Sequence, residues 1–357
     1  MGGERPTDGS RRTGLVVYRD TGGVDAIDEY SRRLVAAFVE QGTPAQYVAE
    51  GLSAARRRGG DPAWVLLQYN PFSYGRRGIA PGLLRDAAAL RRRSGTRFAV
   101  CVHEPWTYVY DWRSALMAAA HRAQLPALLA LADVVLAVTE ELARRLGRDT
   151  IHVPVGSNLT AVALSPRAAR ERLGIGSEVV VALFGTNHPS RALDHAEAAI
   201  GALATSRGAD AVRVLNLGRD APPLEVPAGV AVDAPGRLEA RELSVRLRAS
   251  DIVLLPFADG LSTRRTTLMA ALAHGLAVAG LRGAGTDSVL TGHPEALVLT
   301  PAGHPAVYAN AVVELAADPA RLRTMGEAGR RLYEQHFDWP VLAHRVSSAL
   351  HRGAPAP

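Results

Sequence analysis

Residues 250–280 read SDIVLLPFADGLSTRRTTLMAALAHGLAVAG. The apolar run from Ile252 to Phe257 predicts a buried strand, and a polar, Gly-containing loop follows it. The apolar spacing from Leu268 to Ala273 predicts a helix, and Leu276 to Gly280 predict a second strand. A strand, a loop, a helix and another strand in this order are typical of a parallel βαβ unit. The stretch therefore favours an α/β fold with parallel sheets.

The same alternation of strands and helices extends along most of the chain. Before residue 160, we expect strands at 13–18, 63–68, 97–103, 134–139 and 151–155, with helices at 27–38 and 140–146. After residue 165, we expect strands at 179–184 and 212–217, helices at 191–203 and 238–249, and a last strand at 296–299. The pattern thus restarts once, which indicates two sheets of similar size.

The length agrees with this division, since 357 residues exceed what one ordinary core holds. We expect two Rossmann-like doubly wound domains that face each other across a cleft and join near residues 159–169. The expected parts are a disordered tail at 1–12, an N-terminal domain at 13–164, a C-terminal domain at 165–338, a helix at 339–351 packing near the linker, and a tail at 352–357.

The basic residues are unusual because all 41 of them are arginine. Without lysine there is no Schiff base for pyridoxal phosphate and no Walker A phosphate site. The net charge of +6 is compatible with nucleic acid, an anionic membrane surface or anionic substrates. The densest clusters, at 56–58 and 91–93, have no interleaved aromatic residues, so we expect no nucleic-acid partner. We expect these clusters to be solvated helix ends. The alternative is a weak peripheral contact with anionic lipid or with an anionic acceptor.

The single cysteine, Cys101, excludes an intrachain disulfide and fits a reducing cytoplasm, which is the expected location. No apolar run approaches ~18 residues, and the polar N-terminus does not resemble a secretory signal. We expect no metal and no bound cofactor, because His188 and His195 lie seven residues apart without an acidic partner.

The loop after the strand at 252–257 carries Arg264 and Arg265 where the next helix begins. Free N–H groups and the positive end of a helix favour an anion there, and two guanidiniums can fork onto phosphate oxygens. The chemistry predicts a phosphate or diphosphate site. The alternative is an exposed helix cap without a ligand.

Several segments together resemble the GT-B glycosyltransferases of the large retaining family 4 type, which includes sucrose and trehalose synthases. The strongest match is residues 250–280, where a bacterial branch is similar in carrying Asp-Gly-x-Ser-x-Arg-Arg. GGVDAIDEYSRRL (22–34) resembles the family's glycine loop and first helix, and VHEPW (102–106) places His103 at an N-domain histidine. FGTNHPSR (184–191) resembles a phosphate loop, and GRLEARELSVRLRASDIVLLP (236–256) resembles the segment leading to the signature.

This resemblance implies a nucleotide-diphosphate sugar as co-substrate, an N-terminal acceptor domain and a C-terminal donor domain. The leaving phosphate oxygen would take the acceptor proton, so no protein base is required. The implied catalytic residues are His103, Arg191, Arg264 and Arg265. The implied donor-binding residues are Gly22, Gly23, Gly185, Thr186, Arg191, Leu238, Asp259, Gly260, Leu261, Ser262, Thr263, Arg264, Arg265 and Thr266. The implied acceptor-binding residues are Glu104, Trp106 and Tyr108.

The chain departs from the family's pattern at three positions. Thr186 stands at the family's phosphate-binding arginine, while Arg191 stands at its lysine. Ser262 and Ala270 fall on its paired glutamates, the second of which typically holds the donor ribose. A coupling enzyme for non-sugar cyclitols and a non-catalytic partner subunit therefore remain alternatives. A phosphorylase is disfavoured because its cofactor needs a lysine.

Overall fold

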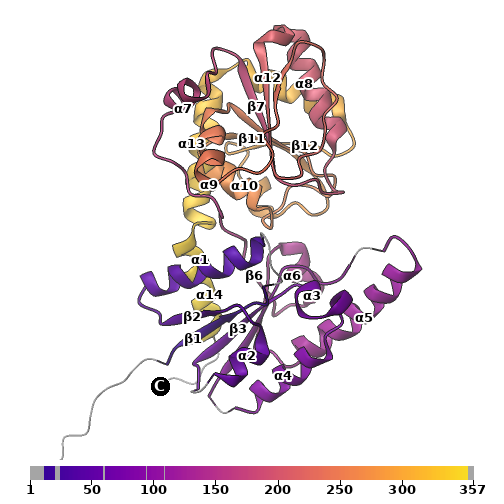
Figure 1. Cartoon of the computed structure of the whole chain (residues 1–357), viewed down its shortest axis with the longest axis vertical. Helices are drawn as coiled ribbons and strands as arrows, with labels where there is room; N and C mark the ends of the chain where they lie inside the picture. The colour runs from indigo at the N-terminus through magenta and orange to yellow at the C-terminus, as the bar shows by residue number, and fades with distance from the viewer. Residues whose placement is uncertain (1–11, 21–24, 59–60, 94, 108, 353–357) are drawn as a thin grey trace, which may run out of the picture. The chain divides into compact units, whose positions relative to one another are not determined.

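The computed structural model describes residues 12–20, 25–58, 61–93, 95–107 and 109–352 (Figure 1). The chain folds into two compact units. The first comprises Met1–Val138, Leu142–Val153 and Leu342–Pro357, and the second comprises Thr139–Glu141 and Pro154–Val341. Each unit is built on its own parallel sheet.

The sheet of the first unit has six parallel strands in the order β2-β1-β3-β4-β5-β6. Their bounds are β1 Gly14–Val17, β2 Ala45–Val48, β3 Trp64–Tyr69, β4 Arg97–Val102, β5 Val134–Ala137 and β6 Ile151–His152. The central strands β3 and β4 are almost wholly buried, which explains their unbroken apolar character.

The sheet of the second unit also has six parallel strands, in the order β12-β11-β10-β7-β8-β9. Their bounds are β7 Val179–Phe184, β8 Val212–Leu217, β9 Ala231–Asp233, β10 Ile252–Leu255, β11 Ala277–Arg282 and β12 Val298–Pro301. The order reverses between β10 and β7, so this pair is the topological switch point of the sheet.

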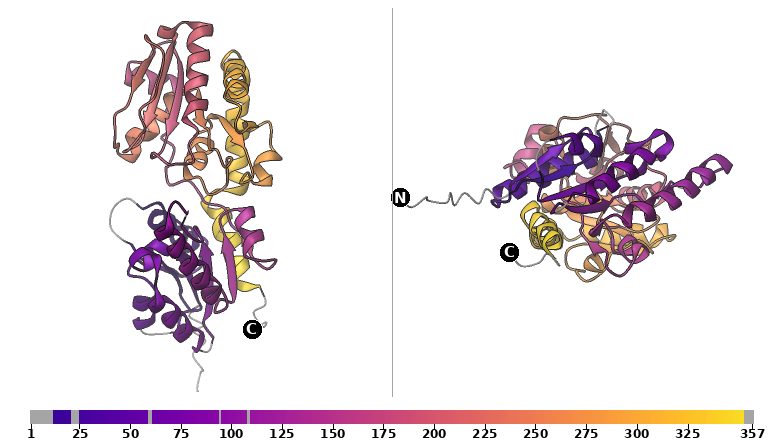
Figure 2. Two further views of the ribbon diagram at one scale, coloured as in Figure 1. Left: turned by 90° about the vertical axis from the view of Figure 1, so that its right-hand side faces the viewer. Right: turned by 90° about the horizontal axis from the view of Figure 1, so that it is seen from below.

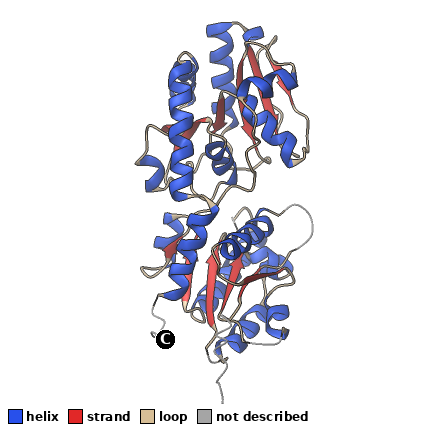
Figure 3. Ribbon diagram, turned by 90° about the vertical axis from the view of Figure 1, so that its left-hand side faces the viewer, coloured by secondary structure: helices blue, strands red, loops and turns tan. Residues whose placement is uncertain are grey.

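A segment without a helix joins β8 to β9, and helices connect the other successive strands in both units (Figures 2 and 3). Before the second sheet they are α1 Ala26–Glu40, α2 Leu52–Arg57, α3 Pro71–Tyr74, η1 Arg76–Gly78, α4 Pro81–Arg91, α5 Trp112–Leu129, α6 Glu140–Leu146 and α7 Pro166–Leu173. Those that follow are α8 Leu193–Arg207, η2 Ala209–Ala211, α9 Ala240–Ala249, α10 Thr266–Ala273, α11 Ser288–Thr291, α12 Pro305–Ala316, α13 Pro319–His336 and α14 Trp339–His351. In the second unit, α8 packs against α12 and α10 against α13.

The predicted α/β class with two parallel sheets is confirmed. The expected strands at 179–184 and 212–217 and the helix at 140–146 match to the residue. Sequence reasoning missed β2 and β9, which lie at sheet edges. Edge strands need no continuous apolar run, and β2 indeed exposes Gln46. The clusters at 56–58 and 91–93 lie at the ends of α2 and α4, as expected for helix ends.

None of the helices in the described part of the chain is long and apolar enough to cross a membrane.

Gly14 is fixed by close packing at the start of β1. A Cβ at this position would lie 2.0 Å from Cε2 of Trp64, whose ring also packs on Phe38. We expect Gly14→Ala to lower the free energy of unfolding by about 1–3 kcal/mol, because overpacking forces the ring or strand to move. Urea denaturation monitored by circular dichroism measures the effect.

Gly201 in α8 is the matched control, because a Cβ there would meet nothing within 4 Å. Gly201→Ala should be neutral or stabilise by about 0.5–1 kcal/mol through helix propensity. Equal denaturation midpoints for Gly14→Ala and the wild type would contradict the proposed packing constraint.

Candidate functional site

The loops after β7 and β10 meet at the switch point of the second sheet. Arg191 pairs with Phe257 in an antiparallel bridge. Ala258 N donates to Ser190 O at 2.7 Å, and Ala192 N donates to Pro256 O at 2.9 Å. Ligands of open α/β sheets bind beyond the carboxyl ends of the strands at such a point. The structure therefore brings together the two segments that carry the predicted arginines.

Asp259 organises the arginine pair at the end of β10. Its Oδ2 accepts from Arg264 Nη2 at 2.8 Å, and its Oδ1 accepts from Arg265 Nη2 at 3.0 Å. Arg265 Nη2 also donates to Ser190 Oγ at 3.0 Å. The Arg265 side chain is only 12% exposed and Arg264 is 28% exposed. Both side chains are therefore held in a hydrogen-bonded network, and neither is fully exposed to solvent.

Phe257 lies beneath two of the guanidiniums. Cζ of Arg265 lies 4.0 Å from the ring centroid, and Cζ of Arg191 lies 5.6 Å from it. Nη2 of Arg191 donates to the carbonyl of Phe184, while its buried Nε has no hydrogen-bond partner among the described residues. Burial lowers the pKa of Arg191 to about 10, so this side chain is still cationic at neutral pH.

The cluster keeps a positive charge despite Asp259. Arg191, Arg264 and Arg265, together with this carboxylate, carry a formal net charge of +2. His188, in the same loop as Arg191, senses this charge: its pKa is lowered by burial and by the nearby Arg265 and Arg264. In addition, Arg265, the N-cap residue of α10, makes no side-chain capping hydrogen bond. The first N–H groups of α10 therefore point toward the loop with no capping side chain to accept from them. The arrangement suits a ligand with two negative charges, such as a diphosphate.

The loop from Asp259 to Thr263 is held rigidly behind the arginines. Gly260 has φ +93°, and a Cβ there would lie 2.6 Å from the N atom of Gly283. Leu261 is buried, and its N donates to Leu281 O at 2.8 Å. Asp287 Oδ2 accepts from both N and Oγ1 of Thr263, at 2.6 and 2.8 Å. The loop is thus tied to β11 and to the segment after it.

Ser262 and Ala270 replace the glutamates that the resemblance leads one to expect. Both are buried. Oγ of Ser262 has no hydrogen-bond partner among the described residues, so a polar atom is left unused behind the arginines.

Backbone segments come very close together at the loop after β7. Gly185 has φ +118°, and its Cβ would lie 2.7 Å from Nη2 of Arg191. A Cβ on Gly218 would lie 2.2 Å from the carbonyl oxygen of Gly185. Side chains at either position would push Arg191 or the β7 and β8 loops away, which explains both glycines.

Other predicted residues of this unit lie around the cluster. Thr186 is exposed in the loop after β7, and Thr266 is the first residue of α10. Leu238 is half-buried just before α9. His195 does have an acidic partner, contrary to expectation, since its Nδ1 lies 2.9 Å from Oδ1 of Asp194. Gly22, Gly23 and Tyr108 lie outside the described residues.

Sequence reasoning missed Ser190, Phe257 and Asp287 as parts of this site. Ser190 precedes Arg191, and Phe257 lies two residues before Asp259. Knowing that the loops after β7 and β10 are in contact would have identified both. Asp287 follows the Gly-rich segment after β11, which is a loop signal that went unused. No group of His, Cys, Asp and Glu in the described part of the chain has the arrangement of a metal site.

His103 lies directly after β4 in the first unit and is 8% exposed. Its Nε2 lies 2.7 Å from Oε1 of Gln68, and its ring meets Tyr30 edge-on at 5.3 Å. An amide oxygen can only accept, so Nε2 carries the hydrogen and donates. Burial lowers the pKa of His103 to about 4, which makes it a neutral hydrogen-bonding group.

The switch point of the first sheet carries a hydroxyl–carboxylate network that the sequence did not reveal. The Tyr18 hydroxyl, after β1, donates to Asp25 Oδ2 at 2.6 Å and lies 2.6 Å from Ser73 Oγ, in α3 after β3. Burial and the Asp25 carboxylate raise the pKa of Tyr18. This network adjoins the carboxyl ends of two neighbouring strands.

The expected acceptor residues lie after β4. Glu104 is exposed, and its Oε2 accepts from Asn70 Nδ2 at 3.4 Å. Trp106 is half-buried against the core, and Cζ of Arg122 lies 5.3 Å from its ring centroid. Their accessible polar and aromatic surfaces are compatible with binding a hydroxylated ligand.

The fold is similar to those of several solved structures, among them GT-B glycosyltransferases. Sucrose-phosphate synthase from Thermosynechococcus elongatus matches with a TM-score of 0.68 at 17% identity, over 94% of this chain and 98% of that one. Anabaena HepE in complex with UDP-glucose matches with a TM-score of 0.65 at 14% identity, over 95% and 99%. The N-terminal domain of Candida albicans trehalose-6-phosphate phosphatase matches with a TM-score of 0.67 at 10% identity, over 99% of each.

The chain therefore has the GT-B fold that its sequence led us to expect. No protein-family model matches it, and no curated protein matches it in sequence. One of the similar structures comes from a phosphatase, so likeness of fold alone does not assign the activity.

The lowered pKa of His188 provides a direct test of the charge of the cluster. We expect the pKa to rise toward 6.5 in Arg265→Gln and in Arg264→Gln, because removing a nearby cation makes the imidazolium easier to form. Binding of a diphosphate to the wild type should shift it in the same direction. Histidine NMR titration measures these values.

Arg167→Gln is the control for the His188 titration. The Arg167 side chain is 89% exposed and pairs with Glu171 in the same unit. It should leave the His188 pKa unchanged. A His188 pKa that is equally insensitive to Arg265→Gln would contradict the assigned electrostatics.

Burial of neutral His103 makes stability depend on pH. The unfolded chain takes up a proton near pH 6.5, whereas the folded chain does so only near pH 4. Stability is therefore complete above pH 6.5 and falls between 6.5 and 4, by up to roughly 3 kcal/mol. Urea denaturation of His103→Gln across this range should give a flatter profile, while exposed His304→Gln should leave the slope intact. An unchanged slope in His103→Gln would refute this linkage.

Proposed function

We propose that this chain is a retaining glycosyltransferase that moves a sugar from a nucleotide-diphosphate donor to a small-molecule or glycan acceptor. The observation that carries the proposal is the cluster of Arg191, Arg264 and Arg265 at the switch point of the second sheet. Its net positive charge, its uncapped helix start and its glycine floor match the needs of a diphosphate. The GT-B fold supports the same reading.

The arginines would act mainly on the leaving group. The bond between the anomeric carbon and the diphosphate oxygen breaks, and the acceptor oxygen forms the new bond on the same face of the sugar. The acceptor proton passes to the departing phosphate oxygen, which conserves charge without a protein base. Guanidiniums that are already oriented stabilise the charge developing on that oxygen, which is commonly the largest electrostatic contribution to catalysis.

Asp259 has a specific part in this reaction. In the described structure it holds Arg264 and Arg265 in place, and a diphosphate would compete with it for the same Nη2 atoms. The two arginines are thus ordered before the donor arrives, which reduces the entropy lost on binding. Arg191 is held by a carbonyl, so its charge is available to the donor without competition from a carboxylate.

In the first unit, neutral His103 and the Tyr18–Asp25–Ser73 network are the proposed contacts for sugar and acceptor hydroxyls. They occupy carboxyl ends of neighbouring strands, as ligand-binding groups of such sheets do. Because Gln68 Oε1 accepts from Nε2 of His103, the hydrogen lies on Nε2, and the other ring nitrogen, Nδ1, can act only as an acceptor.

A non-catalytic partner subunit is the second candidate, favoured by one observation. The acidic residue expected to hold the donor ribose is absent, with buried Ala270 in its place. Ser262 Oγ cannot supply a charge, although its unused hydrogen-bonding capacity leaves room for a ribose contact. If the chain does bind a donor, the missing acid means that the diphosphate contributes more to binding than the nucleoside does.

A donor screen tests the proposal. HepE has been solved with UDP-glucose, which makes this donor the first probe, followed by GDP-, ADP- and dTDP-sugars. We expect one of them to raise the melting temperature by mass action and to release its nucleoside diphosphate when an acceptor is present. Arg265→Gln should lower kcat about 100- to 1000-fold, as loss of one oriented donor to a developing oxyanion does.

Arg167→Gln is again the matched control and should turn over as the wild type does. Absence of turnover with every donor, together with tight binding to another protein, would favour the partner-subunit alternative. Wild-type kinetics for both Arg265→Gln and Arg191→Gln would exclude the arginine cluster as the donor site.

A further inference from the structure

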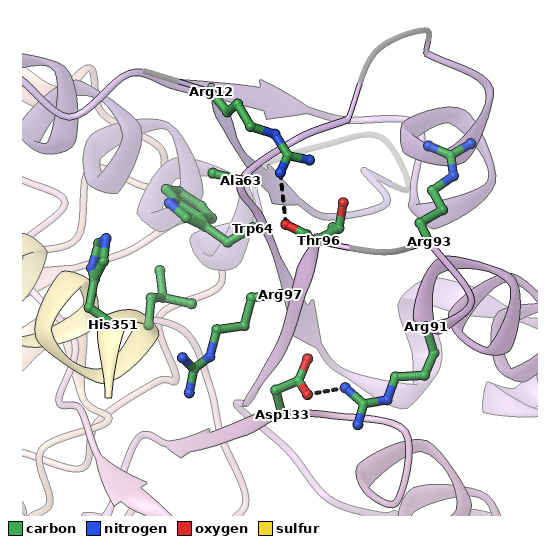
Figure 4. Close-up of a pocket in the computed structure, with 11 residues that line it drawn as sticks. Arg12, Ala63, Trp64, Arg91, Arg93, Thr96, Arg97, Asp133 and His351 are labelled. Atoms are coloured by element: carbon green, nitrogen blue, oxygen red, sulfur yellow. Dashed lines mark hydrogen bonds and ion pairs between the residues drawn. The ribbon is translucent and has the colours of Figure 1, made fainter. Parts of the chain in front are cut away.

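A second basic site lies in the first unit, at the amino-terminal ends of the strands of its sheet. A cavity of about 540 Å³ opens where the strands begin (Figure 4). Trp64 is the first residue of β3, Arg97 the first of β4, and Asp133 directly precedes β5. Arg12 precedes β1, and the end of α14 closes one side with Leu350 and His351.

The cavity is far from the carboxyl ends where the proposed substrate groups lie. β4 runs from Arg97 at the cavity to Val102, and His103 follows at the other end. Six residues of extended chain span roughly 20 Å. The cavity is therefore a separate site, and it cannot be an extension of the acceptor region around His103.

The wall of the cavity carries four arginines and one acidic side chain, Asp133. Arg91 forms an ion pair with Asp133, whose other oxygen accepts from Phe98 N at 2.9 Å. Four guanidiniums against one carboxylate leave a net charge of +3. Such an excess in a concave site concentrates anions, because the low-dielectric wall focuses the field.

The other three arginines are oriented by neutral groups. Arg12 donates to the carbonyls of Asp61, Gly95 and Pro62 at 2.7, 3.0 and 3.2 Å. Arg93 donates to the carbonyl of Arg56 at 2.7 Å, and Arg97 donates to that of Arg352. Carbonyls fix the guanidiniums without cancelling their charge. Nε of Arg97 is also buried without a hydrogen-bond partner among the described residues.

These features distinguish the cavity from a solvated arginine surface. On such a surface the guanidiniums are mobile and pair with nearby acids, and their order costs entropy when a ligand binds. Here three of them, Arg12, Arg93 and Arg97, are held by carbonyls, and all three line the same cavity (Figure 4). Arg91, with 52% of its side chain exposed, lies at the entrance.

We propose that this cavity binds a compact anion bearing two phosphate groups, at a site separate from the donor and acceptor regions. Guanidiniums form paired hydrogen bonds with phosphate oxygens, and the +3 charge matches two phosphates. Trp64 is 5% exposed and Leu350 is buried, so the apolar wall offers no stacking surface for a base. The ligand is therefore recognised through its phosphates, whether it is a free metabolite or the headgroup of an anionic lipid.

Inorganic pyrophosphate is the probe, titrated by calorimetry at constant ionic strength into the full chain. Arg265→Gln serves as the background, so that binding at the proposed donor site does not obscure the result. In that background we expect one pyrophosphate site. Adding Arg93→Gln and Arg97→Gln should weaken it by roughly tenfold to a hundredfold, as for lost hydrogen bonds between charged groups. Arg93→Lys, which keeps the charge but loses the paired hydrogen bonds, should weaken binding less than Arg93→Gln does.

Arg92→Gln is the matched control. Arg92 is the C-cap residue of α4, next to Arg93 in the chain, and it is exposed and does not line the cavity. It should bind pyrophosphate as the background does. Absence of binding in the background protein, or equal affinity with and without Arg93 and Arg97, would overturn the proposal. Neither result would affect the donor site, which is tested by sugar-nucleotide turnover in the wild type.

Vesicle sedimentation identifies the source of the phosphates. Cardiolipin vesicles, whose headgroup carries two phosphates, would support the site with a lipid headgroup as its ligand if they bind the wild type and Arg92→Gln but not Arg93→Gln/Arg97→Gln. Pyrophosphate binding without sedimentation would support it with a free metabolite. Sedimentation that is equal for both variants would show that lipid is bound elsewhere, and it would overturn the headgroup reading of the cavity.

Discussion

The parallel pairing of β10 with β7 is the constraint on which the arginine cluster of the second unit depends. These strands are far apart in sequence, yet Ile252 lies opposite Val181 in the sheet. Their following loops must therefore leave the sheet side by side, and Arg191 comes to lie against Phe257. Without this pairing the arginines of the two loops would be unrelated surface charges. With it, they share one aromatic support and one carboxylate.

Burial gives the arginine cluster its character. Three cations so close together would repel one another strongly in a low-dielectric setting. Asp259 and the face of Phe257 offset part of this repulsion, and a bound anion would offset more of it. The same charge excess lowers the pKa of His188. Arg12, Arg93 and Arg97 in the first unit show another solution, since carbonyl dipoles orient them and leave their charge intact.

Sequence patterns predicted what depends on local periodicity. β7 and β8 were predicted to the residue because buried central strands are unbroken apolar runs. Arg264 and Arg265 were found because they follow a strand and begin a helix. Contacts made across the fold were not accessible in this way. The bond from Asp287 to Thr263 spans 24 residues, and the cavity beside Arg97 is assembled from the starts of separate strands and the last helix.

The contact between Gly185 and Gly218 bears on how this protein could change over evolutionary time. The floor of the arginine cluster is bare main chain, and the next residue to enter either position would meet a carbonyl or a guanidinium. Neither site can therefore contribute to a new specificity. The side chains of Thr186 and Asn187 beside this floor are exposed. Substitutions that alter what the cluster accepts are therefore expected at these two positions rather than at the two glycines.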